Sequence, residues 1–244
     1  MAIEVFNRYE RKFMINDEVY QKLRAGLSEY MQADEHSENG EFYTICNIYY
    51  DTPDNQLIRS SVDAKRDGRV YKEKLRLRSY GKAELTDKVF LEIKKKYRKL
   101  VNKRRTKIYL QDAYTYLETG IQPVLEPFMN RQVFHEIDYM TRRMPLVPKL
   151  FLSYDRCAMF GKEDREFRVT FDRNITTRRY DLGLHYGIYG DKLLPEDEWI
   201  MEIKIEHAMP MFMTELLSEL QIYPVSFSKY GTEYMRHVVA LQAV

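Results

Sequence analysis

Four cations recur at every second position over residues 72–78, with leucines at positions 75 and 77 between them. They are Lys72, Lys74, Arg76 and Arg78. Successive side chains of a β-strand point to opposite faces, so this spacing predicts a strand with a cationic face and an apolar face. Arginine binds phosphate oxygens in pairs, and lysine binds them as a point charge. The pattern is therefore typical of a strand that could bind phosphate groups.

Residues 89–96 repeat the pattern after a turn at Gly81, with Glu92 and Lys94 on one face and apolar residues on the other. Like charges that lie opposite each other on neighbouring strands destabilise a sheet. Such charges are tolerated when a polyanion or carboxylates lie between them. The alternative is a solvated outer face of an antiparallel sheet, and for Lys72 and Lys74 both positions remain open.

Other predicted strands carry charges on one face in the same way. The charged positions collected from all of them are Glu10, Lys12, Arg76, Arg78, Glu92, Lys94, Arg156, Arg168, Glu202 and Lys204. The sparse carboxylates would suit Mg²⁺ or Mn²⁺, which bind through one or two carboxylates together with phosphates. Glu10 and Glu92 are either such ligands or partners that balance Lys12 and Lys94. At Ser228 and Lys229 the start of a helix coincides with a lysine, which gives a further place for a phosphate oxygen.

Hydrophobic periodicity predicts the elements that hold these residues. Strands are expected at residues 6–12, 43–50, 71–78, 89–96, 106–110, 149–159, 166–172 and 199–206. Helices are expected from Asn16 or Asp17 to about Met31, from Asp112 to Gly120, and over residues 126–142, 211–221 and 228–241, with one or two helical turns at 55–62. A sheet with one apolar and one charged face can close into a barrel, which removes its edges. We therefore expect an α+β fold, a closed antiparallel barrel of about eight strands with surrounding helices, as one domain over residues 1–244.

Composition excludes several classes of protein. The net charge is only +2, whereas a nucleic-acid coat would show a clear cationic surplus, so no nucleic-acid partner is expected. Cys46 and Cys157 are too few for a disulfide framework and lack metal-ligand spacing. No apolar run reaches the about 20 residues that span a bilayer, and the amino terminus is not a signal peptide. These features predict a cytoplasmic protein without a membrane segment.

Nine short motifs, in order along the chain, resemble the triphosphate tunnel metalloenzymes. Within that group they resemble the catalytic domain of the vacuolar transporter chaperone (VTC) polyphosphate polymerases. The motifs are YERKF (9–13), IYYDT (48–52), LRLR (75–78), LEIK (91–94), KRR (103–105), YDR (154–156), RVTFD (168–172), MEIK (201–204) and SFSKY (226–230). Each is common by itself, but nine in sequence are specific.

The resemblance implies a tunnel in which the γ-phosphate of ATP is transferred to inorganic polyphosphate, with release of ADP and use of Mn²⁺ or a similar ion. It implies that phosphates are held by Lys12, Arg76, Arg78, Lys94, Arg156, Arg168 and Lys229, with Lys103 and Arg105 in the same set. It also implies that Glu202 is the metal ligand. We expect ATP and polyphosphate as partners, whereas the sequence gives no indication of a protein partner.

Relatives with this fold hydrolyse triphosphate or form cyclic AMP, so the fold alone does not fix the reaction. Those groups usually begin with an E-x-E-x-K strand, and here Arg8 replaces the first glutamate. The loss of that acid favours transfer over hydrolysis. The alternatives are a triphosphate or nucleotide hydrolase and a non-catalytic polyphosphate-binding module.

Overall fold

The computed structural model describes residues 9–34, 42–63, 71–97 and 100–242. Its helices are α1 (Asp17–Leu27), α2 (Gln56–Asp63), α3 (Leu110–Thr119), α4 (Arg131–Arg143), α5 (Met211–Glu219) and α6 (Lys229–Gln242). The longer strands are β1 (Tyr9–Asn16), β3 (Tyr43–Asp51), β4 (Tyr71–Tyr80), β5 (Lys88–Tyr97), β6 (Leu100–Tyr109), β7 (Val147–Gly161), β8 (Arg168–Arg178) and β10 (Glu198–Ile205). Short strands are β2 (Met31–Ala33), β9 (Asp191–Lys192) and β11 (Pro224–Val225).

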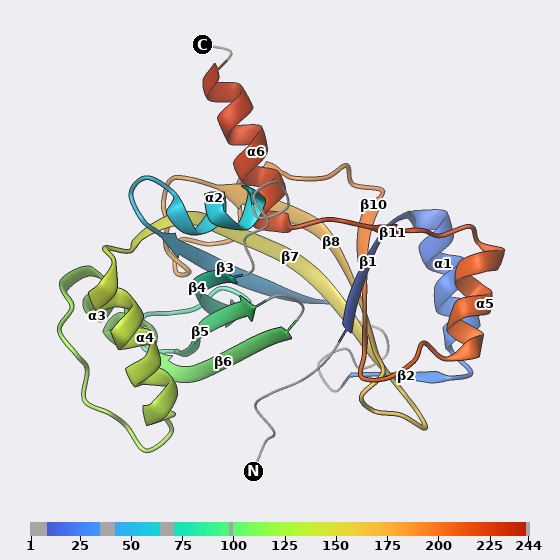
Figure 1. Cartoon of the computed structure of the whole chain (residues 1–244), viewed down its shortest axis with the longest axis horizontal. Coiled ribbons are helices and arrows are strands. Elements are labelled where there is room, and N and C mark those ends of the chain that lie inside the picture. The colour runs from blue at the N-terminus through green and yellow to red at the C-terminus, as the bar shows by residue number, and fades with distance from the viewer. Residues whose placement is uncertain (1–8, 35–41, 64–70, 98–99, 243–244) are drawn as a thin grey trace.

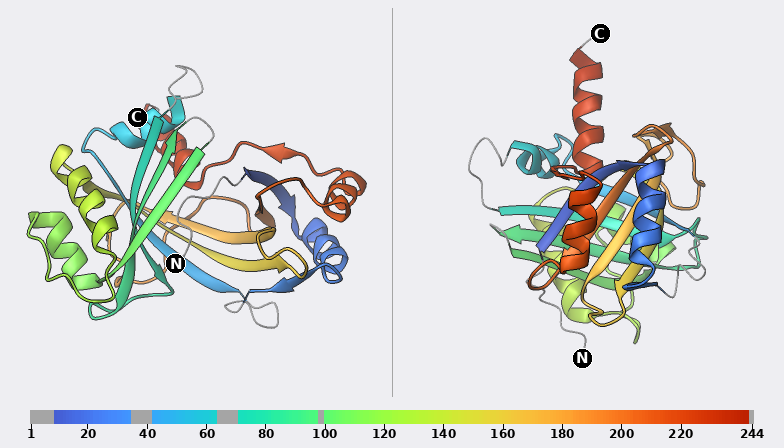
Figure 2. Two further views of the ribbon diagram at one scale, coloured as in Figure 1. Left: turned by 60° about the horizontal axis from the view of Figure 1, so that its bottom comes forward. Right: turned by 90° about the vertical axis from the view of Figure 1, so that its right-hand side faces the viewer.

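These strands form one 11-stranded sheet in the order β11-β1-β10-β8-β7-β3-β4-β5-β6, with β2 paired to β7 and β9 paired to β8. The pairs described are antiparallel, for example β1 with β10 and β5 with β6. The expected closed barrel is wrong, because within the described ranges β6 pairs only with β5 and the sheet stays open. The sheet is strongly twisted, and its β4–β6 end crosses the direction of β7 and β8 (Figures 1 and 2).

Charge explains why this sheet does not need to close. The edge strand β6 carries Lys103, Arg105 and Lys107 on one face, and charged residues are a common protection of sheet edges. Pairing β6 with β1 would also bring these cations close to Lys12, which is unfavourable. A side-chain contact links the two ends instead: Lys94 Nζ on β5 lies 3.9 Å from Glu10 Oε2 on β1.

Helices cover the convex face of the sheet in two separate places. The apolar sides of β4 and β5 pack with α3 and α4, where Leu77, Leu91 and Phe134 are fully buried. The apolar sides of β1, β8 and β10 pack with α1 and α5, and Leu23 and Phe171 belong to this second cluster. The views in Figures 1 and 2 place these helix pairs at opposite ends of the molecule. The apolar residues of the alternating strands thus face outward to the helices, and the charged residues face inward.

The concave face is not charged throughout. Near α2 and α6 it carries a third apolar cluster, in which Tyr49 of β3 and Leu152 of β7 pack with Ile58 and Tyr230 of the helices. The carboxylate of Asp51 fixes this corner, because it accepts hydrogen bonds from the backbone N–H groups of Thr52, Leu57 and Ile58. The charged part of the concave face is therefore bounded on one side by α2 and α6.

Local sequence signals locate most elements but not all their ends. Asn16 accepts a hydrogen bond from Val19 N as the cap of α1, and α3 ends at Gly120 in the left-handed conformation with φ 75°. The expected cap at Asp112 is wrong, since α3 begins at Leu110. Strand β6 begins at Leu100, well before the expected strand at 106–110. The first residues of the strand expected at 6–12, including Arg8, lie outside the described residues.

Candidate functional site: a cationic concave face

Strand register brings the predicted site residues together on the concave face. Lys12 is the Cα partner of Glu202, Arg76 is the partner of Glu92, and Arg156 is the partner of Asp172. Each strand contributes alternate residues to this face. The cations placed on it are Lys12, Lys74, Arg76, Arg78, Lys94, Lys103, Arg105, Arg156, Arg168, Lys204 and Lys229. They outnumber its carboxylates, which are Glu10, Glu92, Asp172 and Glu202.

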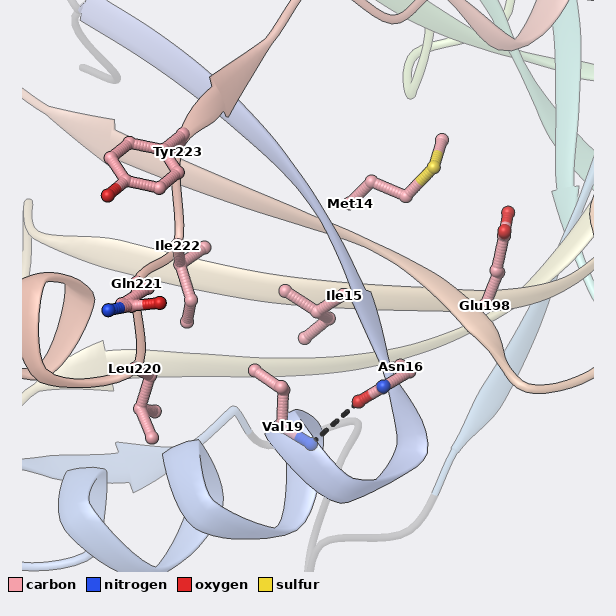
Figure 3. A pocket seen from close by; sticks show the side chains of 9 residues that line it. All are labelled: Met14, Ile15, Asn16, Val19, Glu198, Leu220, Gln221, Ile222 and Tyr223. Atoms are coloured by element: carbon pink, nitrogen blue, oxygen red, sulfur yellow. Dashed lines mark hydrogen bonds between the residues drawn. The ribbon is translucent and has the colours of Figure 1, made fainter.

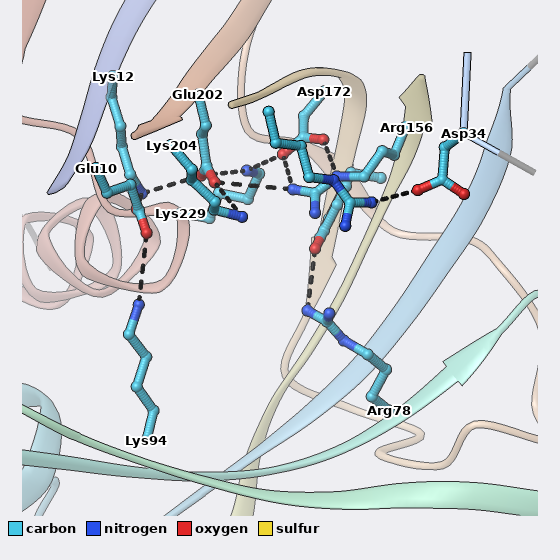
Figure 4. Close-up of polar contacts among 12 residues, drawn as sticks. Glu10, Lys12, Asp34, Arg78, Lys94, Arg156, Asp172, Glu202, Lys204 and Lys229 are labelled. Carbon is cyan, nitrogen blue, oxygen red and sulfur yellow. Dashed lines mark hydrogen bonds and ion pairs between the residues drawn. The ribbon is translucent and has the colours of Figure 1, made fainter. Parts of the chain in front are cut away.

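The first group of charges, which we call the Glu202 cluster, comprises Glu10, Lys12, Arg156, Asp172, Glu202, Lys204 and Lys229. Glu202 Oε1 lies 3.1 Å from Lys12 Nζ and 3.7 Å from Lys229 Nζ. Asp172 receives two hydrogen bonds from Arg156, of 2.6 and 2.7 Å, and one of 2.5 Å from Lys229. Figure 4 shows these side chains converging from β1, β10, β8, β7 and α6. Two buried acids thus hold the cations at fixed positions.

The second group, the Glu92 cluster, comprises Arg76, Arg78, Glu92 and Lys103 from the neighbouring strands β4, β5 and β6. Arg76 Nε donates to Glu92 at 2.6 Å, and Lys103 Nζ lies 3.1 Å from the other carboxylate oxygen. Glu92 is 1% exposed, so a single buried acid here faces three cations. The cluster therefore retains excess positive charge.

Residues on both sides bridge the space between the clusters. Lys94, two residues after Glu92 on β5, lies 3.9 Å from Glu10, and Figure 4 shows this contact. On the other side, Arg78 donates to the hydroxyl of Tyr154 at 3.0 Å, and Lys229 Nζ lies 4.5 Å from the centre of the Tyr154 ring. The two clusters consequently form one continuous cationic surface across the concave face.

The carboxylates of both clusters are held in the ionised state. Burial by itself would raise the pKa of Glu202, but Lys12, Lys229 and Lys204 outweigh it and hold that pKa well below its ordinary value. Arg76, Arg78 and Lys103 in the same way outweigh burial and lower the pKa of Glu92. At neutral pH the acids are therefore charged, and the surplus of cations is a true excess of positive charge.

Three lysines of the face have weakened basicity. Burial lowers the pKa of Lys103 well below its ordinary value, although Glu92 acts in the opposite direction. Burial lowers the pKa of Lys204 to about 8, although Glu202 acts in the opposite direction. Burial also lowers the pKa of Lys74 to about 8, and the nearby cations Lys94 and Lys12 act in the same direction. These ammonium groups are the ones whose charge a bound anion would stabilise most.

The remaining predicted residues take different positions. Arg168 pairs with Asp34 at 2.6 Å at the margin of the face. The Arg105 guanidinium lies over the ring of Phe90, 4.4 Å from its centre. Ser228 precedes α6, and its hydroxyl accepts a hydrogen bond from Gly231 N. Lys74, whose place the sequence left open, lies on the concave face opposite Lys94. Its neighbour Lys72 lies on the same side of β4 and donates to Ser61 O of α2.

Sequence reasoning missed three residues that organise the site. Asp172 is fully buried and binds both Arg156 and Lys229. Asn47 accepts a hydrogen bond from Arg78 Nε at 2.9 Å, and Tyr154 accepts the second one. The signal for Asn47 is a single polar residue within the apolar and aromatic run from Ile45 to Tyr50 of β3. Asp172 and Tyr154 lie within the motifs RVTFD and YDR. Nothing in these motifs distinguishes the roles of the two residues from those of other strand residues.

The fit of a divalent ion rests on Glu10 and Glu202. Lys12 Nζ lies 3.4 Å from Glu10 Oε1 and 3.1 Å from Glu202 Oε1, so one cation already lies between these carboxylates. No group of three or more His, Cys, Asp or Glu side chains suited to a metal occurs among the described residues. Mg²⁺ and Mn²⁺ often use only one or two carboxylates and take further oxygens from phosphates. Glu10 and Glu202 fit such an ion, and Glu92 lies in the other cluster; the metal assignment stays a prediction.

A groove elsewhere on the molecule has a different character. It measures about 380 Å³ and lies between β1, the start of α1 and the segment after α5 (Figure 3). Its lining consists of Met14, Ile15, Asn16, Val19, Glu198, Leu220, Gln221, Ile222 and Tyr223. The hydrogen bond drawn among them is the cap of α1, from Val19 N to Asn16 Oδ1. With no cation in its lining, this groove is not suited to phosphates.

Comparison with known proteins agrees with this geometry. The VTC domain matches residues 7–237. No curated protein matches the chain. A solved structure from Bacillus halodurans, described as a candidate adenylate cyclase, has 16% identity and a TM-score of 0.55, over 93% of this chain and 96% of the other.

Two further solved structures are less similar. A candidate adenylate cyclase of Vibrio parahaemolyticus has 13% identity and a TM-score of 0.48, over 93% of this chain and 97% of its own. A protein of Pyrococcus horikoshii has 14% identity and a TM-score of 0.47, over 94% and 99%. The family match covers nearly the whole sequence and confirms the resemblance that its motifs indicate. The chain belongs to the VTC domain family.

Proposed function

We propose that the protein is an ATP-dependent polyphosphate polymerase, which transfers the γ-phosphate of ATP to a growing polyphosphate chain and releases ADP. The observation that carries this proposal is the continuous cationic surface formed by the Glu202 and Glu92 clusters. Its cations exceed its carboxylates, and a linear chain of phosphates has the charge to match them. Membership of the VTC domain family supports the same reaction class.

Phosphoryl transfer requires positioning and neutralisation of charge more than a nucleophile from the protein. In the proposed reaction a terminal oxygen of the polyphosphate chain attacks the γ-phosphorus of ATP. The bond from that phosphorus to the β,γ-bridging oxygen breaks, and ADP takes its electron pair. Arg76, Arg78 and Arg156 would hold the reacting phosphates in line, because each guanidinium is fixed by buried partners.

Glu10 and Glu202 would hold Mn²⁺ or Mg²⁺ together with phosphate oxygens. When bound, the ion would neutralise charge that develops on those oxygens. Lys12 would then leave its position between the two carboxylates and contact a phosphate instead. The lysine and the ion would thus exchange partners within one site.

The partners that we propose are ATP and inorganic polyphosphate, and the small net charge of +2 gives no support for nucleic acid. Cys46 and Cys157 are both buried free thiols, which fits a reducing compartment such as the cytoplasm. Among the helices of the described part of the chain, none is long and apolar enough to cross a membrane.

The test is to incubate the protein with ATP and Mn²⁺ and to measure ADP, long polyphosphate, orthophosphate and cyclic AMP separately. Equal amounts of ADP and of phosphate incorporated into polymer would support the proposal. Orthophosphate without polymer would assign the protein to the hydrolases, and cyclic AMP would assign it to the cyclases. Triphosphate binding without turnover would leave a binding module.

Variants connect the activity to the concave face. Arg76→Ala should abolish polymer formation, and Glu202→Gln should abolish metal-dependent turnover but retain some binding of ATP. The matched control is Arg142→Ala, because Arg142 is an exposed arginine on α4, on the convex side. Full activity in Arg76→Ala would contradict the assignment of the site.

A further inference from the structure

Three aromatic side chains form a row on the concave face, beside the phosphate-binding cations. The ring centres of Tyr43 on β3 and Tyr80 on β4 are 5.9 Å apart, and those of Tyr80 and Phe90 on β5 are also 5.9 Å apart. Tyr80 and Phe90 meet edge to face at 89°. Three neighbouring strands thus contribute one ring each to a continuous aromatic row.

Strand register places this row next to the arginines of the site. Phe90 is the Cα partner of Arg78, and Tyr43 is the Cα partner of Arg156. Tyr80 stands two residues after Arg78 on the same face of β4. Side chains of directly opposed residues on neighbouring strands lie about 5 Å apart at Cβ. A ligand whose phosphates contact Arg78 and Arg156 would therefore have its other end within reach of the rings.

Cations also lie over the aromatic row. The Arg105 guanidinium lies 4.4 Å from the centre of the Phe90 ring, and Lys107 Nζ lies 5.9 Å from it. Arg105 was predicted to bind phosphate, but its observed position is at the ring. A guanidinium over an aromatic ring presents a second flat surface. Bases stack on both kinds of surface.

Aromatic pairs on neighbouring strands often serve only to stabilise a sheet. Two observations favour binding here. Tyr80 is 45% exposed. Neither Tyr80 nor Phe90 belongs to one of the buried apolar clusters, whereas Tyr43 packs against the edge of the cluster near α2 and α6. In addition, α2 and α6 cover the concave face near Tyr49, at the opposite end of β3 from Tyr43. Within the part of the chain that the structure describes, a bulky group attached to a bound triphosphate therefore has more room at the end where the aromatic row lies.

We propose that Tyr43, Tyr80 and Phe90 bind the purine base of the nucleoside triphosphate whose phosphates lie on Arg78 and Arg156. The inference rests on the proposed function, and it assigns which end of the cationic face receives the nucleotide. Base stacking contributes about 1–3 kcal/mol per base in proteins that bind single strands. This range corresponds to about 5-fold to 150-fold in affinity. Inorganic polyphosphate has no base, so the aromatic row should not increase its affinity.

The experiment is a fluorescence titration with 2-aminopurine riboside triphosphate, whose emission is quenched when the base stacks. Tripolyphosphate competes with this nucleotide for the phosphate site, so the competition measures the affinity of each variant for tripolyphosphate. Tyr80→Ser and Phe90→Leu remove one ring each, and Tyr80→Phe keeps the ring but removes the hydroxyl. The matched control is Tyr139→Ser, since Tyr139 of α4 is 69% exposed and lies on a convex-side helix.

We expect Tyr80→Ser and Phe90→Leu to lose most of the quenching and about 5-fold or more in nucleotide affinity, with tripolyphosphate affinity unchanged. Tyr80→Phe and Tyr139→Ser should behave like the wild type. Unchanged quenching in both ring-deletion variants would overturn the aromatic site and leave the phosphate site intact. A wild-type protein that binds neither probe would refute the proposed function itself. Equal loss of both ligands in the ring-deletion variants would also refute the aromatic site, because the rings would then act only on the phosphates.

Discussion

Replacement of Asp172 by asparagine tests how the cationic face is held together. The carboxylate is fully buried, and it receives hydrogen bonds of 2.6 and 2.7 Å from Arg156 and of 2.5 Å from Lys229. Asparagine has nearly the same shape but no charge. The variant therefore leaves two buried cations with Glu202 as the remaining acid of the contact, at 3.9 Å from Arg156 and 3.7 Å from Lys229.

The expected cost follows from this geometry. Removal of one partner from a buried ion pair typically costs about 3–5 kcal/mol. Because Glu202 still compensates part of the charge, we expect the lower end, a loss of about 3 kcal/mol in the free energy of unfolding. For a chain of this size that loss lowers the Tm by about 6–12 °C. Tripolyphosphate should restore more stability to the variant than to the wild type, because an anion replaces the missing charge.

The pH dependence has a defined sign. Burial would raise the pKa of Asp172, but Arg156 and Lys229 outweigh it and lower that pKa in the folded protein. The ionised carboxylate therefore stabilises the fold above the unfolded-state pKa of about 4. This stabilisation is lost as the pH falls from about 4 toward the lower folded-state pKa. Asp172→Asn should lack this part of the acid sensitivity.

The assay is urea unfolding of the wild type and variant, with and without tripolyphosphate, at pH 7 and in the acid range. The matched control is Asp155→Asn on the adjacent strand β7. Asp155 accepts hydrogen bonds from the neutral side chains of Thr44 and Asn174. If Asp172→Asn costs no more than Asp155→Asn, or if tripolyphosphate stabilises both equally, Asp172 does not balance the buried cations and the reasoning is refuted.

Three further predictions concern other parts of the site. Asp51→Ala should lower the free energy of unfolding by about 2–4 kcal/mol in urea titrations, because it leaves buried N–H groups of α2 without an acceptor. Tripolyphosphate affinity, measured by calorimetry, should fall as the pH rises through about 8, because Lys74 and Lys204 have pKa values of about 8 and lose their charge there. Tyr154→Phe should weaken tripolyphosphate binding about 5-fold at an almost unchanged Tm, because Arg78 loses one of its fixed acceptors.

The period-2 alternation predicted the composition of the concave face well. Side chains of a strand alternate strictly, so Arg76 and Arg78 had to share a face once β4 was recognised, and the same holds for Glu202 and Lys204 on β10. The assignment needs no knowledge of strand order. Lys74 remained open because the same alternation fits an outer face as well as an inner one, and only the packing of the opposite side against helices decides between them.

Closure of the sheet could not be predicted in this way, because closure depends on long-range geometry and not on alternation. If every edge strand had to pair with another strand, the sheet would have to close into a barrel. Edge strands that carry charged residues are stable without such a partner. Here Lys103, Arg105 and Lys107 occupy the edge strand β6, and the contact from Lys94 to Glu10 spans the remaining distance. The sequence contains these charges, but it does not show that they lie at an edge.

The same limit applies to the partners of the cations. Asp172 and Glu92 both appear in the sequence as acids on charged strand faces, with nothing to separate a metal ligand from a counter-ion. The contacts in the structure separate the acids by distance. Glu92 has two cations in close contact, Arg76 at 2.6 Å and Lys103 at 3.1 Å. Glu202 faces four cations, but only Lys12, at 3.1 Å, is close, and Glu10 shares this lysine. A divalent ion has to displace one close ammonium, that of Lys12, from between Glu10 and Glu202, whereas at Glu92 it would have to displace both Arg76 and Lys103. The exchange of Lys12 for an ion is therefore the less costly of the two, which is why we propose Glu10 and Glu202, and not Glu92, as the ligands of a divalent ion.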